Sequence, residues 1–366
     1  MRKQSQIYSI KLCRNEDGMG AVSFGKTKEG NEVTKYTLTN KNGMEVSVID
    51  LGATVVSIKA ADKDGALRDV ALGYDNPVDY QTNTCYFGAV IGRNSNRINQ
   101  ARISLDGTEY ALEANDNENN LHSGSKGFHA VIWNVEKAEA QKIVFTYLSK
   151  DGEQDFPGNM NASVTYELTD ENELVISYQA QSDKTTVANF TNHAYFNLNG
   201  HETGSVEQQE LEILASYYTP MIDAKAIPTG EVAKVSGTPM DFRKMEKIGA
   251  RIRDDFEQLK FAGGYDHNYV LDKADGSMQL AARAKSADSG ICMDVYTDCV
   301  GIQLYTGNFI GEHAGKEGVT YGERHGFCLE TQYFPNAINE ENFKTPVLHP
   351  GEIYKSETKY CFFVEK

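Results

Sequence analysis

The sequence has few cysteines and no Cys-x-x-Cys pair. Its six cysteines are scattered over 366 residues, at Cys13, Cys85, Cys292, Cys299, Cys328 and Cys361. Zinc modules and the disulfide frameworks of small secreted domains both need closely spaced cysteines, so this pattern argues against either. We expect reduced thiols and, by default, a cytoplasmic location. A leader removed before residue 1 would leave no trace in this sequence.

Long apolar runs and nucleotide-binding signatures are also missing. No apolar stretch approaches the length of a membrane-spanning helix, and the first residues lack a signal-peptide core. There is no Rossmann glycine fingerprint, P-loop or internal repeat. Lys and Arg number 36 against 52 Asp and Glu, a formal net charge of -16, which repels nucleic-acid backbones and anionic lipids. We therefore expect a small-molecule partner, with neither nucleic acid nor membrane.

The residues that are abundant favour strands and turns. The chain has 20 Tyr, 16 Phe and 32 Gly, and apolar residues alternate with polar ones in many segments, as in 143–147, 164–168 and 174–178. Asn42-Gly43 and Asp106-Gly107 predict hairpin turns. One segment has helical spacing, with Phe242, Met245, Ile248, Ile252 and Phe256 at intervals of three or four. The pattern predicts an all-β chain with one short helix there.

The segment at the centre of the argument is 187–200, VANFTNHAYFNLNG. Asparagines beside aromatic residues predict a strand that runs into a tight turn and directs His193 into a cleft. A lone histidine is more often structural than catalytic, so the assignment depends on other polar segments. FGAVIGRNSNRI carries Asn96 and Arg97, NNLHSGSKGF carries His122, and GGYDHNYVL carries Asp266. GIQLYTGN carries Gln303.

Glu330 stands out because it lies within the apolar strand FCLETQ. A buried carboxylate is costly unless it is paired or functional. Amides, arginine and carboxylates bind sugar hydroxyls, and one carboxylate with one histidine supplies a general base and a general acid. These residues therefore indicate a carbohydrate site.

Eight segments, in order between about Lys35 and Cys361, resemble the aldose 1-epimerase (galactose mutarotase) family. They are GRNSNRI, NNLHSGSKGF, DGEQDFPGN, TNHAYFNLNG, PTGE with GTPMDFR, GGYDHNYVL, GIQLYTGNF and LETQYFPNAIN. The resemblance implies a large β-sandwich with a few short helices, the galactose mutarotase-like supersandwich. We expect an N-terminal extension with the first strands over 1–30 and one domain over 31–366. It also implies no cofactor, and interconversion of the anomers of free hexoses such as galactose and glucose. We expect no metal.

The resemblance also assigns roles to individual residues. By their places in these motifs, Glu330 matches the general base and His193 the general acid. The residues matching those that hold the sugar are Asn96, Arg97, His122, Asp266 and Gln303. An imidazole that protonates the ring oxygen must start charged, so we expect a carboxylate, Asp266 or Glu330, to raise the pKa of His193. From the residues alone, His122 could exchange roles with His193.

The sequence departs from the family pattern at four positions. Ser123 replaces a glycine of LHGG, Ser95 an alanine, Asn336 an aspartate, and Asp155 stands where glycine is frequent. None of these changes removes a proposed catalytic group. Ser123 and Asp155 could alter loop shape and sugar preference.

Other functions fit part of this pattern. A hexose-6-phosphate 1-epimerase would need a cluster of cations, but near the proposed loops there is only Arg97, with Arg93 as a second candidate. A non-catalytic carbohydrate-binding protein would not need Glu330 in an apolar strand. A glycoside hydrolase could use Glu330 with Asp266. A metal site formed by His122, His193 and Asp266 matches no common zinc spacing. The preferred aldose and the oligomeric state stay open.

Overall fold

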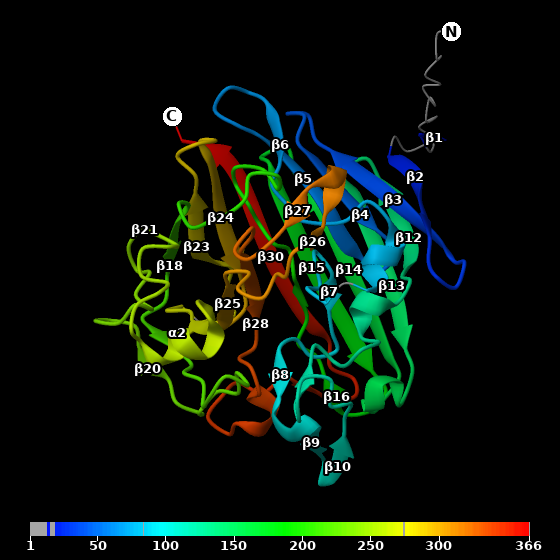
Figure 1. Ribbon diagram of the computed structural model, residues 1–366. Coiled ribbons are helices and arrows are strands. Elements are labelled where there is room, and N and C mark those ends of the chain that lie inside the picture. The colour runs from blue at the N-terminus through cyan, green and yellow to red at the C-terminus, as the bar shows by residue number, and fades with distance from the viewer. Residues whose placement is uncertain (1–12, 15–18, 83, 274, 366) are drawn as a thin grey trace.

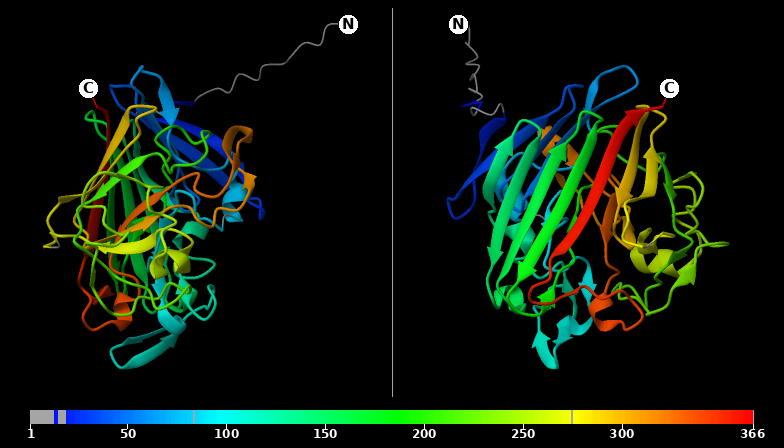
Figure 2. Two further views of the ribbon diagram at one scale, coloured as in Figure 1. Left: turned by 60° about the vertical axis from the view of Figure 1, so that its left-hand side comes forward. Right: turned by 180° about the vertical axis from the view of Figure 1, so that it is seen from behind.

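A computed structural model describes residues 13–14, 19–82, 84–273 and 275–365. The largest unit is a nine-stranded antiparallel sheet, seen from its outer side in the right-hand view of Figure 2 with β30 near its middle. Its strands, in sheet order, are β12 (Asn134–Glu139), β13 (Lys142–Ser149), β14 (Met160–Leu168), β15 (Glu173–Ser182), β30 (Tyr354–Val364), β24 (Ile291–Thr297), β23 (Gln279–Lys285), β18 (Glu210–Ile213) and β21 (Glu246–Lys247).

Two smaller antiparallel sheets cover the inner face of this sheet (Figure 1). The six-stranded sheet consists of β1 (Cys13–Arg14), β2 (Gly20–Lys26), β3 (Glu32–Thr39), β4 (Glu45–Ile49), β5 (Thr54–Ala61) and β6 (Leu67–Asp69). The five-stranded sheet has the order β20 (Ala233–Lys234), β19 (Tyr217–Tyr218), β22 (Asp266–Val270), β25 (Gly301–Tyr305) and β28 (Cys328–Gln332).

Short strand pairs and helices complete the described chain. The pairs are β7 (Val90–Ile91) with β17 (Thr191–Asn192), β8 (Arg97–Ile98) with β11 (Asn120–Leu121), β9 (Arg102–Leu105) with β10 (Thr108–Ala111), β16 (Thr186–Val187) with β29 (Val347–Leu348), and β26 (His313–Ala314) with β27 (Thr320–Tyr321). The helices are α1 (Pro77–Gln81) and α2 (Glu257–Ala262), with single 3-10 turns at Asn99–Ala101, Phe128–Ala130, Glu153–Asp155, Lys316–Gly318 and Ala337–Asn339.

The main apolar core lies between the layers. In β14 and β15 every second side chain is buried, as the alternation of a strand requires when one face is covered. Hydrogen bonds also join the layers. The Tyr166 hydroxyl of β14 donates to the Ala53 carbonyl at 2.6 Å, and the Tyr360 hydroxyl of β30 donates to the Leu329 carbonyl of β28 at 3.0 Å. The strand that carries Glu330 is thus anchored directly to the large sheet.

The structure confirms the predicted all-β class and both predicted hairpins. Turns at Asn42-Gly43 and Asp106-Gly107 join β3 to β4 and β9 to β10. The predicted strands at 143–147, 164–168 and 174–178 are β13, β14 and β15. Among the described residues, five cysteines form no disulfide with one another, as expected: Cys85, Cys292, Cys299, Cys328 and Cys361.

The helix expected over 242–256 is wrong. That segment is mostly turns and irregular chain, and its residues 246–247 form β21, which pairs with β18; helix α2 begins at Glu257. Phe242, Ile248 and Ile252 are nevertheless buried in the main core. Irregular chain can bury residues at helical spacing, and here pairing with a sheet edge prevails over local periodicity.

Two expectations about the whole chain remain. The predicted division at residue 31 falls in the turn between β2 and β3, which are paired strands of one sheet, and it stays a prediction. Neither helix in the described residues is long and apolar enough to span a membrane.

Candidate active site

A cavity of about 170 Å³ collects most of the polar residues singled out in the sequence. It receives side chains from the five-stranded sheet, from the loops around β7 and β17, and from the β8–β11 pair. The lining residues are Thr84, Cys85, Tyr86, Asn96, Arg97, Leu121, His122, His193, Tyr195, Asp266, Tyr305, Phe309 and Glu330. Six of the seven predicted site residues are among them, and Gln303 is the exception.

Glu330 lies in the middle of β28 with 2% of its surface exposed. Its Oε2 atom has no hydrogen-bond partner among the described residues. Burial, followed by the nearby charge of Asp266, raises the pKa of Glu330 well above its usual value, and Arg97 opposes this shift. A buried carboxylate with a free oxygen atom is suited to exchange protons with a bound molecule.

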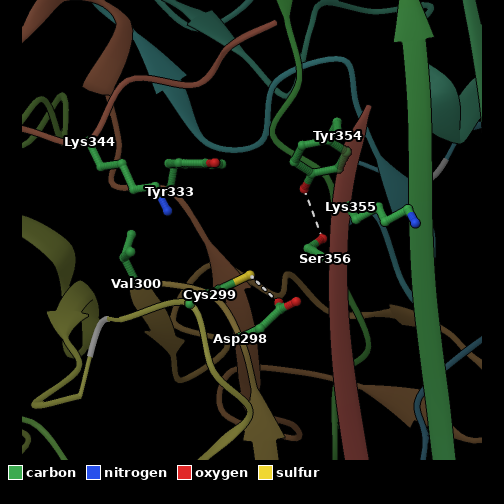
Figure 3. Close-up of a pocket in the computed structure, with 9 residues that line it drawn as sticks. Asp298, Cys299, Val300, Tyr333, Lys344, Tyr354, Lys355 and Ser356 are labelled. Carbon is green, nitrogen blue, oxygen red and sulfur yellow. Dashed lines mark hydrogen bonds between the residues drawn. The ribbon is translucent and has the colours of Figure 1, made fainter. Parts of the chain in front are cut away.

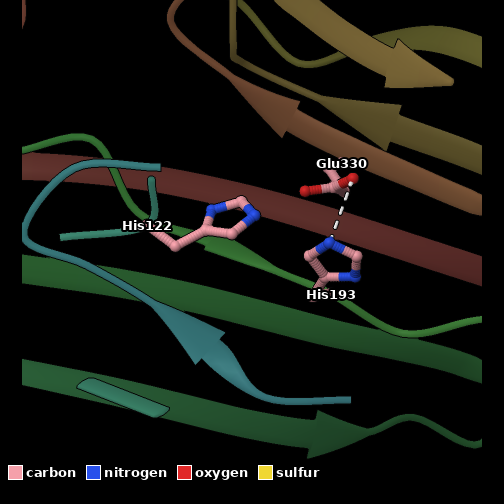
Figure 4. Close-up of side chains that lie close together, drawn as sticks. All are labelled: His122, His193 and Glu330. Carbon is pink, nitrogen blue, oxygen red and sulfur yellow. Dashed lines mark ion pairs between the residues drawn. The ribbon is translucent and has the colours of Figure 1, made fainter. Parts of the chain in front are cut away.

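His193 directly follows β17, and its backbone is fixed on both sides. Its N–H donates to the Ala89 carbonyl, and its own carbonyl accepts the N–H of Gly88, both at 2.9 Å. The ring stacks on Tyr195 at 5.1 Å between centroids. Its Nε2 atom lies 3.7 Å from Glu330 Oε1, as Figure 4 shows. The acid and base candidates therefore face each other directly.

The carboxylate neighbour expected for His193 is thus Glu330, but the expected rise in pKa is wrong. Burial lowers the pKa of His193 to about 4. The reason is that the free-energy cost of removing an imidazolium from water exceeds the stabilisation that the nearby groups give to its charged form. Both members of the pair are therefore shifted toward their uncharged forms.

His122 has a different environment, although its ring lies 5.3 Å from that of His193. Its Nδ1 atom accepts the backbone N–H of Asn96 at 3.1 Å. A nitrogen that accepts a hydrogen bond carries no proton, so the proton of a neutral His122 is on Nε2, which makes this atom a donor. If the ring were charged, Nδ1 would also carry a proton, and this N–H would face the backbone N–H of Asn96. His122 is therefore suited to donate to a hydroxyl and unsuited to act as a charged acid.

Arg97 and Asn96 form one wall of the cavity. Arg97 Nε donates to Asp116 Oδ2 at 2.7 Å, which fixes the guanidinium. Arg93, the second cation considered for a phosphate, is 2% exposed and its guanidinium hydrogen-bonds to Ser149 and to nearby carbonyl groups such as that of Pro157. Arg93 is thus a structural anchor, and it does not line the cavity.

Asp266 and Gln303 lie on the neighbouring strands β22 and β25. Gln303 Nε2 donates to Asp266 Oδ1 at 2.7 Å, and Gln303 is paired across the sheet with Glu330. Burial raises the pKa of Asp266. Gln303 does not line the cavity, and its hydrogen bond orients Asp266, which does.

Ser123 and Asp155, the two departures with an expected effect on loop shape, occupy backbone positions that favour glycine. Their φ angles are +68° and +65°. The Ser123 hydroxyl accepts the N–H of Asn94 at 2.7 Å and donates to the Asn94 carbonyl at 3.1 Å. These bonds fix the loop that leads to Asn96.

The aromatic side chains of the lining were not predicted from the sequence. Tyr86 packs against His122 at 4.8 Å between centroids and against His193 at 5.9 Å, and Tyr305 is 6.5 Å from His193. Tyr305 follows Gln303 by two residues in a strand, so alternation placed it on the same face. Phe309, with 67% exposure, lies at the rim. Tyr86 had no comparable signal.

The described residues contain one group that could hold a metal ion, formed by His122, His193 and Glu330, with ligand atoms within 4.8 Å of one another. A metal needs a lone pair on each imidazole. The free nitrogen of His122 carries a proton, because its other nitrogen faces the Asn96 N–H. The trio therefore fits a hydrogen-bonded ligand better than a cation.

A second cavity, of about 220 Å³, lies beside the ends of β24, β28 and β30 (Figure 3). Tyr333, Lys344 and Tyr354 line it, together with Asp298 and Cys299. No histidine lines this cavity in the part of the chain that the structure describes. It therefore lacks the facing base and acid of the first cavity.

Comparison with known proteins gives consistent results. The family model described as aldose 1-epimerase matches residues 34–361. The galactose mutarotase of Sus scrofa is 40% identical over 342 residues, which cover 93% of this chain and 97% of the relative. The aldose 1-epimerase of Escherichia coli (strain K12) is 37% identical over 339 residues, covering 92% and 97%. A crystal structure of galactose 1-epimerase from Lactobacillus acidophilus superposes with a TM-score of 0.82 at 28% identity, covering 95% and 99%.

Proposed function

The chain belongs to the aldose 1-epimerase family, and from this premise we infer that it is an aldose mutarotase. Such an isomerase interconverts the α and β anomers of an aldose. We propose free hexoses such as galactose and glucose as its substrates, with Glu330 and His193 as the proton-transfer groups.

In the proposed reaction, the Glu330 carboxylate takes the proton of the C1 hydroxyl while His193 Nε2 gives a proton to the ring oxygen. The bond between C1 and the ring oxygen breaks, and C1 becomes an aldehyde. Rotation about C1–C2 presents the other face of the aldehyde. The ring closes with the proton transfers reversed, so nothing is oxidised or hydrolysed. Each positioned acid or base contributes about 10²–10⁴-fold to such a reaction.

The distance of 3.7 Å between His193 Nε2 and Glu330 Oε1 is the observation that carries this proposal. The two oxygen atoms that exchange protons, the C1 hydroxyl and the ring oxygen, are bonded to the same carbon. The base must reach one of these oxygens and the acid the other, so the two groups must lie close together. Geometry is the first requirement for general acid–base catalysis, and the closeness of this pair supports the proposed roles.

The protonation of the pair is compatible with this mechanism. Burial lowers the pKa of His193 to about 4 and raises that of Glu330, so between the two values the pair holds one proton. The neutral arrangement and the ion pair differ only in where this proton lies. The bound sugar, which contacts both groups, provides the path between them.

The other residues would hold the sugar ring. Asn96, Arg97, His122 and Asp266 line the cavity with donors and acceptors for hydroxyl groups. Gln303 would act through its hydrogen bond to Asp266. A fixed ring leaves proton transfer as the main remaining barrier.

The lining favours a free hexose over a sugar phosphate. Among the described residues of the lining, the side chain with a permanent positive charge is Arg97, and it is paired with Asp116. Asp266 and Glu330 would repel a phosphate group. The buried Arg93 does not reach the cavity.

Polarimetry on freshly dissolved α-galactose and α-glucose tests the function. The protein should accelerate the approach of the optical rotation to equilibrium for at least one sugar, and release no reducing sugar from a glycoside. A rate equal to that of buffer alone for both sugars would contradict the proposal. A cytoplasmic location, the absence of a cofactor, and the single domain over 31–366 stay predictions.

A further inference from the structure

Cys328 lies at the start of β28, two residues before Glu330. Alternation along the strand directs both side chains to the same face. Cys328 is 0% exposed, and its Sγ atom lies 3.6 Å from Nδ1 of His193. One strand thus supplies a neighbour for each nitrogen of the same imidazole: Glu330 for Nε2 and Cys328 for Nδ1.

Resting on the proposed function of this site, we propose that Cys328 is a positioning residue for His193. Its sulfur accepts a hydrogen bond from the Nδ1–H of His193, and this fixes Nε2 as the atom that gives and takes the proton. The role is indirect, because Cys328 acts through His193 and does not line the cavity.

The proposed bond suits every step of the reaction. When His193 is charged, both nitrogens carry protons, and Nδ1–H needs an acceptor. After Nε2 has given its proton to the sugar, Nδ1–H is still in place and Nε2 has the lone pair for the return step. A thiol sulfur is a weak acceptor that meets this need throughout. In the other tautomer, Nε2–H would persist and no lone pair would be available.

A neutral partner at Nδ1 also suits the acid role. Burial raises the pKa of the Cys328 thiol well above its usual value, so the thiol stays uncharged. A carboxylate in its place would stabilise the imidazolium and weaken His193 as an acid. The pKa of His193, lowered to about 4, indicates that the charged ring gives up its proton readily.

The Cys328 thiol is the side-chain partner of Nδ1 in the described residues. The rings of His122 and Tyr305 meet that of His193 edge-on, Tyr195 stacks on it, and Tyr86 is tilted against it. A backbone hydrogen bond of His193 itself also acts on the ring and raises its pKa, against the larger effect of burial. The titratable and charged groups around the ring, from all packed elements, are Tyr86, Arg97, His122, His129, Tyr195, Asp266, Tyr305, Cys328 and Glu330.

The test compares Cys328→Ala with Cys328→Ser, since a hydroxyl keeps the acceptor and nearly the size of the thiol. The matched control is Cys292→Ala, another buried thiol in a strand of the molecule. The turnover number kcat and KM come from polarimetry. The tautomer of His193 comes from the ¹⁵N chemical shifts of its ring, assigned by comparison with His193→Asn.

In the wild type we expect the Nδ1–H tautomer at neutral pH. Cys328→Ala should lower kcat by about tenfold with little change in KM, because a charged donor loses its partner. It should also shift the tautomer toward Nε2–H and move the acid limb of kcat to lower pH. Cys328→Ser should restore most of kcat and the Nδ1–H tautomer, and Cys292→Ala should match the wild type.

Three results would overturn the role of Cys328. They are an Nε2–H tautomer in the wild type, an unchanged kcat in Cys328→Ala, and a Cys328→Ser variant as impaired as Cys328→Ala, which would indicate packing alone. The tautomer measurement does not depend on activity. If the wild type failed to convert sugars, the proposed function would fail while the ¹⁵N shifts still tested Cys328.

Discussion

Two cavities of this molecule have similar volumes, about 170 and 220 Å³, but different chemistry. In the larger one, the polar groups bind each other. Asp298 accepts the Glu357 N–H at 2.9 Å, and the hydroxyls of Tyr354 and Ser356 are 2.9 Å apart (Figure 3). In the smaller one, Glu330 Oε2 has no partner among the described residues, and Glu330 faces His193.

The difference shows that volume does not identify a catalytic site. Buried polar groups normally satisfy each other, and those left unsatisfied are candidates for ligand contacts. Both cavities contain a carboxylate at their wall, so they offer matched pairs of variants. For the variants of Glu330 and Arg97, a matched change in the other cavity serves as the control.

The largest expected effect is that of Glu330→Gln. Glutamine keeps the size and the hydrogen bonds but cannot accept a proton at neutral pH, so mutarotation should fall by about 10²–10⁴-fold. Asp298→Asn, the same change in the other cavity, should leave the rate unchanged. Thermal unfolding should show both variants folded. Activity of Glu330→Gln within a few-fold of the wild type would remove Glu330 from the base role.

The second prediction separates the two histidines of the smaller cavity. At saturating sugar, His193→Asn should lower kcat by about 10²-fold or more, because the acid is lost. His122→Asn should mainly raise KM, since its Nδ1 is occupied by the Asn96 N–H and its ring serves as a neutral donor. If only His122→Asn abolished turnover, the acid would be His122 and our assignment would be wrong.

Arg97→Ala should have a smaller effect, seen in binding. The guanidinium stays charged and is a poor acid, so it holds hydroxyl groups. Loss of a hydrogen bond from a charged group should raise KM by about 10- to 100-fold, with a smaller change in kcat. Lys344→Ala, which removes a cation from the other cavity, should change neither constant. A large fall in kcat at constant KM for Arg97→Ala would contradict this role.

The smallest effect is expected from moderate changes in pH. In the proposed mechanism, the pair of Glu330 and His193 is active while it holds one proton. As pH falls through the lowered pKa of His193, about 4, the pair gains a second proton, and kcat should drop about tenfold per pH unit below this value. As pH rises through the raised pKa of Glu330, the pair loses its proton and kcat falls again. A steep loss already between pH 7 and about 5 would contradict these shifts.

Local signals predicted much of the fold. Asn42-Gly43 and Asp106-Gly107 define hairpins because such turns fit the twist of paired strands, and alternation identified β13 to β15. The order β15–β30–β24 joins strands from residues 173–182, 354–364 and 291–297, and no local pattern specifies that pairing. The same long-range pairing explains the error over 242–256, where β21 joins the edge of the sheet.

The sequence indicated which residues belong to the candidate site, but not how these residues contact one another. Glu330 was identifiable because a carboxylate in an apolar strand is costly. The contact of Glu330 with His193 depends on how β28 lies against the loop after β17, which the sequence does not reveal. Gln303 proved to contact Asp266 from behind the lining, and Tyr86 was missed because its turn carries no periodic signal.

The central claim is that Glu330 and His193 together exchange the anomers of a free hexose. Magnetisation transfer by NMR between the α and β anomeric protons of galactose and of glucose, at equilibrium, measures this exchange without a coupled enzyme. We predict fast exchange, for at least one of the two sugars, with the wild type and with Asp298→Asn, and exchange no faster than in buffer with Glu330→Gln and His193→Asn. Equal exchange in all four proteins, or none in the wild type, would contradict the account.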